Sequence, residues 1–333
     1  MNAIDATGLE LTYADGTEAV RGVDLTVPEG AFFGFLGPNG AGKTTTIKAL
    51  ATLLRPTGGR VAVNGFDAVA NPRAVRRSIG YMAQETSVDP ELTARENVKF
   101  ACEAYGVPRA ERRSRIDDLL DLVDLADAGG KPAKAFSGGM KKRLDVATAL
   151  VHRPPIVFLD EPTTGLDPKA RNRLWEYFRE INARGTTVFL TTQYLAEADA
   201  LCSEISVILN GEIVASGSPE ELKRRVGGDV LEIELDPAAS ADADRAAEIA
   251  RRSGLFDGNA AVVATESGLS VTSAEAKRFG TDLLVALRDA GVVVTGFNVR
   301  SPTLDDVFLA VTGEAEPETA EPEAEGDSRG RGR

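Results

Sequence analysis

A glycine-rich segment, Gly37-Pro-Asn-Gly-Ala-Gly-Lys-Thr44, has the residue types and the spacing that bind a phosphate group. It follows an apolar run from Ala31 to Leu36 and precedes a stretch of helical composition, and a P-loop requires both flanks. Gly40 and Gly42 let backbone N–H groups turn inward without a Cβ clash, at the start of the following helix. A glycine-rich turn with an incidental lysine is the alternative, and this context disfavours it.

Each polar residue at the end of this loop has a predicted role. Lys43 neutralises the β- and γ-phosphates, and the Thr44 hydroxyl is a ligand for Mg²⁺. Thr45 donates to the α-phosphate from the next helical position. The loop residues expected to bind the nucleotide are Gly37, Asn39, Gly40, Ala41, Gly42, Lys43, Thr44 and Thr45.

A second segment, Ile156-Val-Phe-Leu-Asp-Glu161, places two carboxylates where a buried strand ends. Ligands collect at this edge of a parallel sheet. Asp160 is expected to hold Mg²⁺, directly or through water, and Glu161 to polarise the attacking water as general base. Taken alone, the pair could equally be an N-cap of the next helix. The P-loop in the same chain favours the catalytic interpretation.

A third segment lies between these two, Phe136-Ser-Gly-Gly-Met140, and in isolation it is typical of a helix N-cap. It resembles the LSGGQ signature of ABC ATPases, with Phe for Leu and Met for the terminal Gln. Ser137, Gly138 and Gly139 offer a hydroxyl and N–H groups to a phosphate. The resemblance implies that this phosphate belongs to ATP on the opposite subunit, hence a head-to-tail homodimer with two shared sites.

Further residues match the same family in order and spacing. Tyr13 occupies the aromatic position that stacks on adenine. Gln84 matches the Q-loop residue, which touches Mg²⁺ and relays the nucleotide state to a membrane partner. Asp167, in Gly165-Leu-Asp-Pro168, matches the D-loop residue that contacts the other subunit.

One position departs from the family pattern, because Gln193 stands where a histidine is usual. A glutamine can hydrogen-bond a γ-phosphate but cannot exchange a proton near neutral pH, so base catalysis falls on Glu161. The only histidine, His152, is interpreted as a surface or structural residue. The segment from Gln193 to Asp199, the Ser-Gly-Gly-Met sequence and the segment from Pro302 to Gly313 together resemble the daunorubicin-resistance type of drug-exporter ATPase.

The elements that must position these residues follow from hydrophobic periodicity. Alternating strands and helices predict an α/β fold, and the resemblance implies a P-loop NTPase of the ABC type, a nucleotide-binding domain with a helical subdomain at about 85–150. Asn210-Gly211 is a strong type I′ hairpin signal. Strands are expected at 4–12, 23–27, 31–36, 156–159 and 187–191, a helix at about 42–54 and helical structure over 91–127.

The pattern changes after the first domain, which is expected to span residues 1–227. The residue pattern over 228–312 predicts a small α+β domain in the βαββαβ order of the ferredoxin-like arrangement, followed by a short helix. Residues 313–333 are acidic, rich in Glu, Pro and Gly, and have no apolar face, so a disordered tail is expected.

Composition limits the partners. A formal net charge of −13 argues against nucleic-acid binding. Cys102 and Cys202 lie among apolar neighbours and are expected to be buried free thiols. Neither a signal peptide nor an apolar run of about 18 residues occurs, so we expect a cytoplasmic protein on the inner face of the membrane.

The resemblance implies an ATPase subunit of an ABC exporter, with ATP and Mg²⁺ as cofactors. It would power a separate integral-membrane permease, for efflux of a hydrophobic drug or lipid-like compound. The alternative is a soluble ABC ATPase acting on ribosomes or nucleic acid, although no second cassette, long coiled coil or basic arm is visible. A P-loop kinase or small-molecule ligase is disfavoured by the Ser-Gly-Gly segment.

Overall fold

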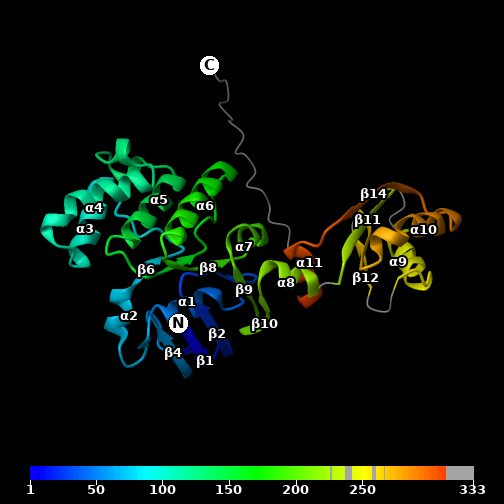
Figure 1. Cartoon of the computed structure of the whole chain (residues 1–333), viewed down its shortest axis with the longest axis horizontal. Helices are drawn as coiled ribbons and strands as arrows, with labels where there is room; N and C mark the ends of the chain where they lie inside the picture. The colour runs from blue at the N-terminus through cyan, green and yellow to red at the C-terminus, as the bar shows by residue number, and fades with distance from the viewer. Residues whose placement is uncertain (226, 237–241, 257–259, 266, 313–333) are drawn as a thin grey trace, which may run out of the picture. The chain divides into compact units, whose positions relative to one another are not determined.

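The computed structural model describes residues 1–225, 227–236, 242–256, 260–265 and 267–312. The acidic tail expected at 313–333 lies outside these residues. The chain divides into two compact units, Met1–Arg225 and Val226–Arg333, and each is considered by itself. Both units mix helices and strands (Figure 1).

A six-stranded sheet with the order β10-β9-β3-β8-β7-β6 forms the centre of the first unit. All neighbours pair in parallel except β10, which is antiparallel to β9. Every residue of β3, β7 and β8 is buried, as expected of parallel strands covered on both faces. The strands are β3 (Phe32–Leu36), β6 (Ile79–Met82), β7 (Ile156–Asp160), β8 (Thr187–Thr192), β9 (Glu204–Leu209) and β10 (Glu212–Gly217).

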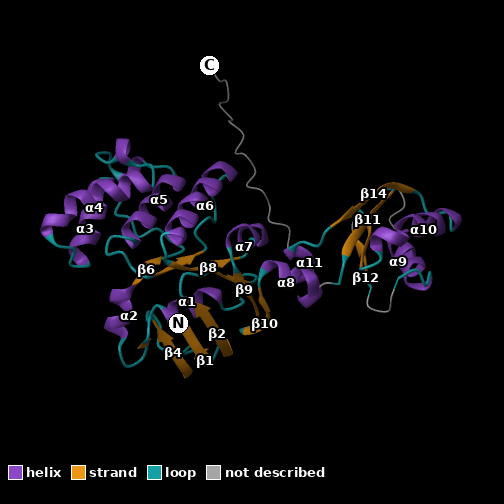
Figure 2. Ribbon diagram, in the orientation of Figure 1, coloured by secondary structure: helices purple, strands orange, loops and turns teal. Residues whose placement is uncertain are grey.

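A second, antiparallel sheet has the order β2-β1-β4-β5. Apolar residues of this sheet, of the central strands and of α1 form one buried cluster, which includes Leu9, Ile47 and Phe158. Helix α1 lies between the two sheets (Figure 2) and brings the end of the glycine-rich loop to both. The elements are β1 (Asn2–Thr12), β2 (Glu18–Pro28), β4 (Gly58–Val63), β5 (Phe66–Asp67) and α1 (Lys43–Leu50).

Helices α3, α4 and α5 gather at one side of the first unit, away from the antiparallel sheet (Figure 1). The region expected to be helical over 91–127 is two helices separated by a turn at Gly106, whose φ is +71°. Thr93 and Glu96 form a capping box that starts α3. The helices are α2 (Pro72–Ser78), α3 (Ala94–Ala104), α4 (Arg109–Leu122), α5 (Gly138–Ala149), α6 (Pro168–Ala183), α7 (Leu195–Leu201) and α8 (Pro219–Arg225), with 3₁₀ turns at Ala126–Ala128 and Ala133–Ala135.

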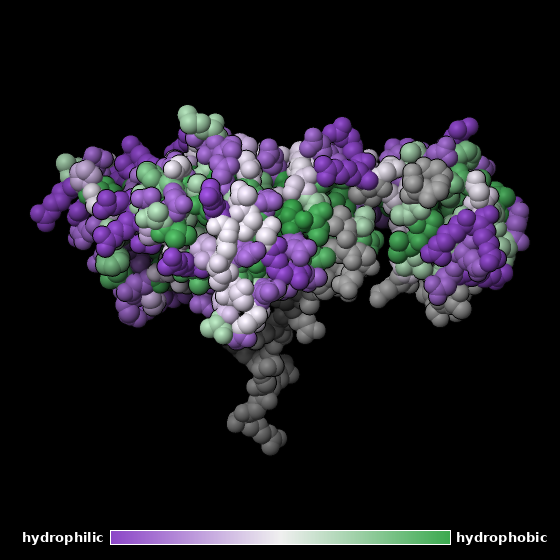
Figure 3. Space-filling view, turned by 90° about the horizontal axis from the view of Figure 1, so that it is seen from below, coloured by the Kyte–Doolittle hydropathy of each residue, from purple (hydrophilic) through white to green (hydrophobic). Residues whose placement is uncertain are grey.

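Several local predictions are confirmed in this unit. Asn210 and Gly211 have φ of +50° and +83° and join β9 to β10, as a type I′ turn requires. Cys102 and Cys202 are free and buried. Hydrophilic and hydrophobic residues are interspersed over the face in Figure 3. Among the described residues, no helix is both long enough and apolar enough to cross a bilayer.

The second unit has a four-stranded antiparallel sheet with the order β12-β13-β11-β14. Two helices connect its strands in the predicted βαββαβ order, and their apolar faces pack into a core with Leu231, Ala246 and Leu283. The elements are β11 (Asp229–Leu235), α9 (Asp242–Arg252), β12 (Ala261–Thr265), β13 (Gly268–Ser273), α10 (Ala276–Asp289), β14 (Val294–Arg300) and α11 (Leu304–Thr312).

Candidate active site

The glycine-rich loop joins the end of β3 to the start of α1, and its backbone is held tightly. A Cβ atom at Gly37 would lie 2.3 Å from the carbonyl oxygen of Ile208, and one at Gly42 would lie 2.5 Å from that of Ala19. Gly42 is the N-cap of α1 with φ +107°, and Gly40 has φ +80°. Only glycine adopts these angles without strain, so the loop geometry depends on both residues.

The N-terminus of α1 has no side-chain cap within the described part of the chain. The first N–H groups of a helix have no partner within the helix, and the helix dipole favours an anion there. These groups fit a phosphate. Tyr13 follows β1 and is 40% exposed, and its hydroxyl lies 2.9 Å from the hydroxyl of Thr45 in α1.

Lys43 is buried, with 4% of its surface exposed. Its Nζ donates to the carbonyl oxygens of Gly37 at 2.7 Å and Pro38 at 3.0 Å, and lies 3.2 Å from Oε1 of Glu161. Burial lowers the pKa of Lys43, and the attraction of Glu161 offsets part of this effect. This ion pair could not be predicted from the sequence, because no local pattern signals a contact between two separate motifs.

Asp160 ends β7 and fits a magnesium ligand. Its Oδ1 accepts from the hydroxyls of Thr191 at 2.6 Å and Thr44 at 3.2 Å. Its Oδ2 is buried and has no hydrogen-bond partner among the described residues. Burial raises the pKa of Asp160. A carboxylate oxygen without a partner, next to a threonine hydroxyl, is the donor set that Mg²⁺ prefers.

Glu161 is held in a strained backbone conformation, with φ of +46°. Its N–H donates to the carbonyl and hydroxyl oxygens of Thr191, both at 3.1 Å. Its Oε2 accepts from Nε2 of Gln84 at 3.3 Å. The next helix, α6, starts at Pro168 with Asp167 as its N-cap. The N-cap alternative for Asp160 and Glu161 is therefore wrong.

Gln84 follows β6 and is also connected to α5. Lys142 Nζ donates to the Gln84 carbonyl at 2.5 Å, and Asp145 Oδ1 accepts from Ser87 N at 3.1 Å and Ser87 Oγ at 2.8 Å. Burial raises the pKa of Asp145. Asp145 is not among the predicted site residues, although an acidic residue between Leu144 and Val146 on a helix is a signal of a buried polar contact.

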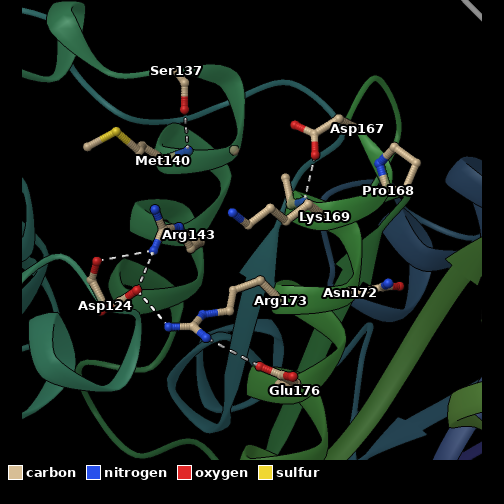
Figure 4. A pocket seen from close by; sticks show the side chains of 12 residues that line it. Asp124, Ser137, Met140, Arg143, Asp167, Pro168, Lys169, Asn172, Arg173 and Glu176 are labelled. Carbon is tan, nitrogen blue, oxygen red and sulfur yellow. Dashed lines mark hydrogen bonds and ion pairs between the residues drawn. The ribbon is translucent and has the colours of Figure 1, made fainter.

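Ser137 is the N-cap of α5, and its Oγ accepts from the N–H of Met140 at 3.3 Å. Ser137 and Gly138 are exposed. Ser137 and Gly139 border an open pocket of about 840 Å³ between the starts of α5 and α6, where Asp167 accepts from Ala170 N at 2.9 Å (Figure 4). The N-cap interpretation of this segment is correct as local structure. A capped helix end still presents its N–H groups to an anion.

Asp124 forms the opposite side of this pocket, pairing with Arg173 at 2.8 Å and Arg143 at 3.5 Å (Figure 4). These charges hold α5 and α6 side by side. No hydrogen bond or ion pair joins residues 137–139 to the glycine-rich loop within the described part of the chain. The structure therefore brings Lys43, Thr44, Gln84, Asp160 and Glu161 together and leaves Ser137, Gly138, Gly139 and Asp167 apart from them.

Gln193 directly follows β8 and is half-buried. Its side chain forms no hydrogen bond with any residue that the structure describes, and the neighbouring Tyr194 N–H donates to the Thr192 hydroxyl at 2.9 Å. His152 stacks on Tyr105 with ring centres 4.0 Å apart, and its Nε2 lies 3.0 Å from the Ile79 carbonyl. His152 is thus a structural residue.

Two family models match this chain. The model described as "ABC transporter" matches residues 20–164, and the model described as "ATP-binding protein DrrA1-3-like, C-terminal domain" matches residues 217–312. The first range includes the glycine-rich loop, the Ser-Gly-Gly segment and the Asp160–Glu161 pair, and the second includes the small α+β unit.

Curated relatives match over nearly the full chain. It is 42% identical to the daunorubicin resistance ATP-binding protein DrrA2 of Streptomyces coeruleorubidus, covering 97% of this chain and 98% of the relative. It is 44% identical to the daunorubicin/doxorubicin resistance ATP-binding protein DrrA of Streptomyces peucetius, covering 93% and 92%. It is 33% identical to the linearmycin resistance ATP-binding protein LnrL of Bacillus subtilis, covering 93% and 98%.

Solved structures resemble the first unit. An ATP-binding subunit of an ABC transporter matches with a TM-score of 0.61 and 31% identity, covering 67% of this chain and 92% of the other. A dimeric ATP-binding cassette in a post-hydrolysis state with ADP and phosphate matches with a TM-score of 0.60 and 28% identity, covering 65% and 98%.

Proposed function

The chain belongs to the family of ABC transporter ATP-binding proteins with a DrrA-like C-terminal domain, and on this premise we propose that its ATP hydrolysis drives an exporter. The observation that carries the proposal is the position of Glu161. Its strained backbone holds the carboxylate 3.2 Å from Lys43 and next to Asp160. A general base must be fixed close to the phosphate-binding group, and Glu161 meets this condition.

Each site residue has a specific task in the proposed reaction. The first N–H groups of α1 and the Lys43 ammonium bind the β- and γ-phosphates, and Tyr13 contacts the adenine. Thr44 and Asp160 hold Mg²⁺ with Gln84 nearby, and the ion neutralises phosphate charge when bound. Glu161 accepts the proton of the attacking water, and Gln193 hydrogen-bonds the γ-phosphate. When Lys43 contacts a phosphate instead of Glu161, the Glu161 carboxylate becomes available to accept the proton.

We further propose that two copies of the chain complete each site. Ser137, Gly138 and Gly139 of one copy bind the phosphate of ATP held by the other, and Asp167 contacts the other copy. The exposed N-terminus of α5 and the open pocket beside it support this arrangement. The similarity to a dimeric ATP-binding cassette supports it as well.

The transported compound and the membrane partner are inferred from the relatives. Three of them are named for resistance to daunorubicin, doxorubicin or linearmycin. We propose that this chain acts at the cytoplasmic face of the membrane with a separate permease, for efflux of a hydrophobic drug or lipid-like compound.

Reconstitution tests this function directly. The chain is co-expressed with the permease candidate encoded next to it, and vesicles are assayed for ATP-dependent daunorubicin transport. Lys43→Ala is the matched control, because it removes the phosphate contact from a buried position. Transport that needs ATP and stops with Lys43→Ala is expected. ATP hydrolysis without any co-purifying membrane protein would contradict the exporter proposal and keep the ATPase assignment.

A further inference from the structure

Helix α7 carries a buried carboxyl group that the proposed mechanism does not use. Glu197 has no exposed surface. Its Oε1 accepts from the Thr163 hydroxyl and from Nε1 of Trp175, both at 2.9 Å. Its Oε2 is buried and has no hydrogen-bond partner in the described part of the chain.

The two donors come from segments that carry proposed site residues. Thr163 lies between Glu161 and Asp167, in the connection from β7 to α6. Trp175 lies in α6, the helix whose N-cap is Asp167. Glu197 itself lies in the first turn of α7, and Gln193 immediately precedes Tyr194, the N-cap of this helix. Through the two hydrogen bonds to its Oε1, Glu197 therefore connects the segment that follows Gln193 with the segments that contain Glu161 and Asp167.

This carboxyl group is costly to keep at a buried position. Burial raises the pKa of Glu197, although hydrogen bonding with Thr192, Trp175 and Thr163 and the charge of Arg171 oppose the shift. The other titratable group close to it is Cys202, whose pKa is raised by burial and by Glu197. Oε2 of Glu197 and Nε of Arg171 are both buried without a hydrogen-bond partner among the described residues. An apolar side chain would leave the Thr163 hydroxyl and Trp175 Nε1 without their acceptor, so the carboxylate at Glu197 is what connects these two donors, and its unpaired Oε2 is the cost of that connection.

We propose that Glu197 is a positioning residue that couples Gln193 to the D-loop. Movement of Gln193 toward a γ-phosphate displaces α7, and the bonds from Thr163 and Trp175 carry this displacement to Glu161 and Asp167. Nucleotide contact at one site thereby sets the position of the residue that contacts the second copy. The inference rests on the proposed roles of Gln193, Glu161 and Asp167.

Substitutions at Glu197 test the coupling by separating kcat from KM. Glu197→Leu keeps the volume and removes the acceptor, so we expect kcat for ATP hydrolysis to fall by roughly tenfold, with KM within about twofold. Glu197→Gln keeps one oxygen that accepts both bonds, so activity should return to within about threefold of the original protein. Trp175→Phe removes one donor and should have an intermediate effect.

A double-mutant cycle excludes a purely structural effect. If Glu197 acts through Gln193, the variant with Gln193→Ala and Glu197→Leu will be no slower than the slower single variant. The proposal would be overturned if the losses in kcat of the two single variants multiply in the double variant. An unchanged kcat in Glu197→Leu would overturn it as well. If thermal unfolding shows that Glu197→Leu does not fold, the cycle is repeated with Trp175→Phe in place of Glu197→Leu. The same two outcomes then support or overturn the proposal.

Parallel assays separate this inference from the proposed function. The unsubstituted chain and Glu161→Gln are measured alongside the Glu197 variants. Absent hydrolysis in the unsubstituted chain, or unchanged hydrolysis in Glu161→Gln, contradicts the proposed function. Normal hydrolysis that depends on Glu161 but not on Glu197 contradicts only the coupling.

Discussion

The proposed site has two halves, the P-loop half with Lys43, Asp160 and Glu161 and the signature half with residues 137–139. They differ in burial and in the hydrogen bonds and ion pairs that their own residues form. In the P-loop half, Lys43 and Glu161 are 4% and 5% exposed and paired with each other, and Asp160 is bonded to two threonines. In the signature half, Ser137 and Gly138 are exposed, and the Ser137 hydroxyl accepts a hydrogen bond from Met140 of α5.

This difference follows from the chemistry of the residues. Charged groups can be buried only when they are paired, so the P-loop half is pre-organised by its own contacts. A capped helix N-terminus needs no further partner to fold, and its remaining N–H groups stay available at the surface. We therefore expect the P-loop half to hold a nucleotide by itself and the signature half to bind only a phosphate that another molecule presents.

The largest effect is expected from the P-loop half. Glu161→Gln keeps the size and most hydrogen bonds of the side chain but removes the base. Hydrolysis should fall about 10²–10⁴-fold while ATP binding persists. The dimer should accumulate with ATP bound, because the reaction that reopens it has stopped. Phosphate release, ATP binding and gel filtration measure the three outcomes.

Glu180→Gln is the matched control for this substitution. Glu180 is an exposed residue of α6, paired with Arg184, and it should leave hydrolysis unchanged. Hydrolysis at the normal rate in Glu161→Gln would remove Glu161 as the base and with it the assignment of chemistry to the P-loop half.

The division into two halves predicts complementation between defective chains. Lys43→Ala disables the P-loop half. Gly138→Glu disables the signature half, because a carboxylate repels the phosphate, while an acidic residue at the start of α5 is compatible with the helix dipole. The Gly138 position has room, with only Leu166 Cδ2 near a new Cβ, at 4.0 Å. Each variant alone should be inactive.

A mixture of the two variants should recover about a quarter of the original activity. Half of the dimers contain one chain of each kind, and each mixed dimer has one intact site out of two. ATPase assays on purified chains mixed in equal amounts give this value. No recovery, with mixed dimers demonstrated by differently tagged chains, would contradict shared sites.

A smaller effect is expected at Gln193, a half-buried residue that follows β8. The side chain makes no hydrogen bond with the described residues, so Gln193→Ala removes only its contact with the nucleotide. We expect hydrolysis to fall by about tenfold. Gln193→His should retain activity and add a titration near pH ~6.5 to the rate profile. Complete loss in Gln193→Ala would show an essential role instead.

Most of the fold could be predicted from local patterns. Apolar runs marked β3, β7 and β8, and Asn210-Gly211 marked a turn, because burial and turn geometry depend on neighbouring residues. The helix expected over 42–54 ends earlier, at Leu50. The break at Gly106 was not predicted, because the composition of 91–127 is typical of a helix throughout and charged residues suit both helix surfaces and turns. The antiparallel strand β4 was not predicted because its Gly-Gly start is typical of a loop.

The site was predictable only as separate motifs. The types and order of Lys43, Asp160 and Glu161 indicated phosphate chemistry. The ion pair of Lys43 with Glu161 and the buried bonds of Asp145 and Glu197 could not be predicted, because they join residues that the fold brings together from distant positions. Contacts of this kind depend on the three-dimensional packing of several elements.

The smallest effect is expected from Asp145, which attaches α5 of the signature half to the Gln84 loop of the P-loop half. Burial raises its pKa above the ordinary value of 3.8, so its contribution to stability is complete below that value and is lost as pH rises through the folded-state pKa. Asp145→Asn does not titrate. Relative to the original chain, its free energy of unfolding should therefore rise between pH ~4 and pH ~8. Denaturant unfolding across this range measures the difference. A relative loss at high pH would mean that Lys142 and Ser87 favour the carboxylate, and that the link between the halves is ionic.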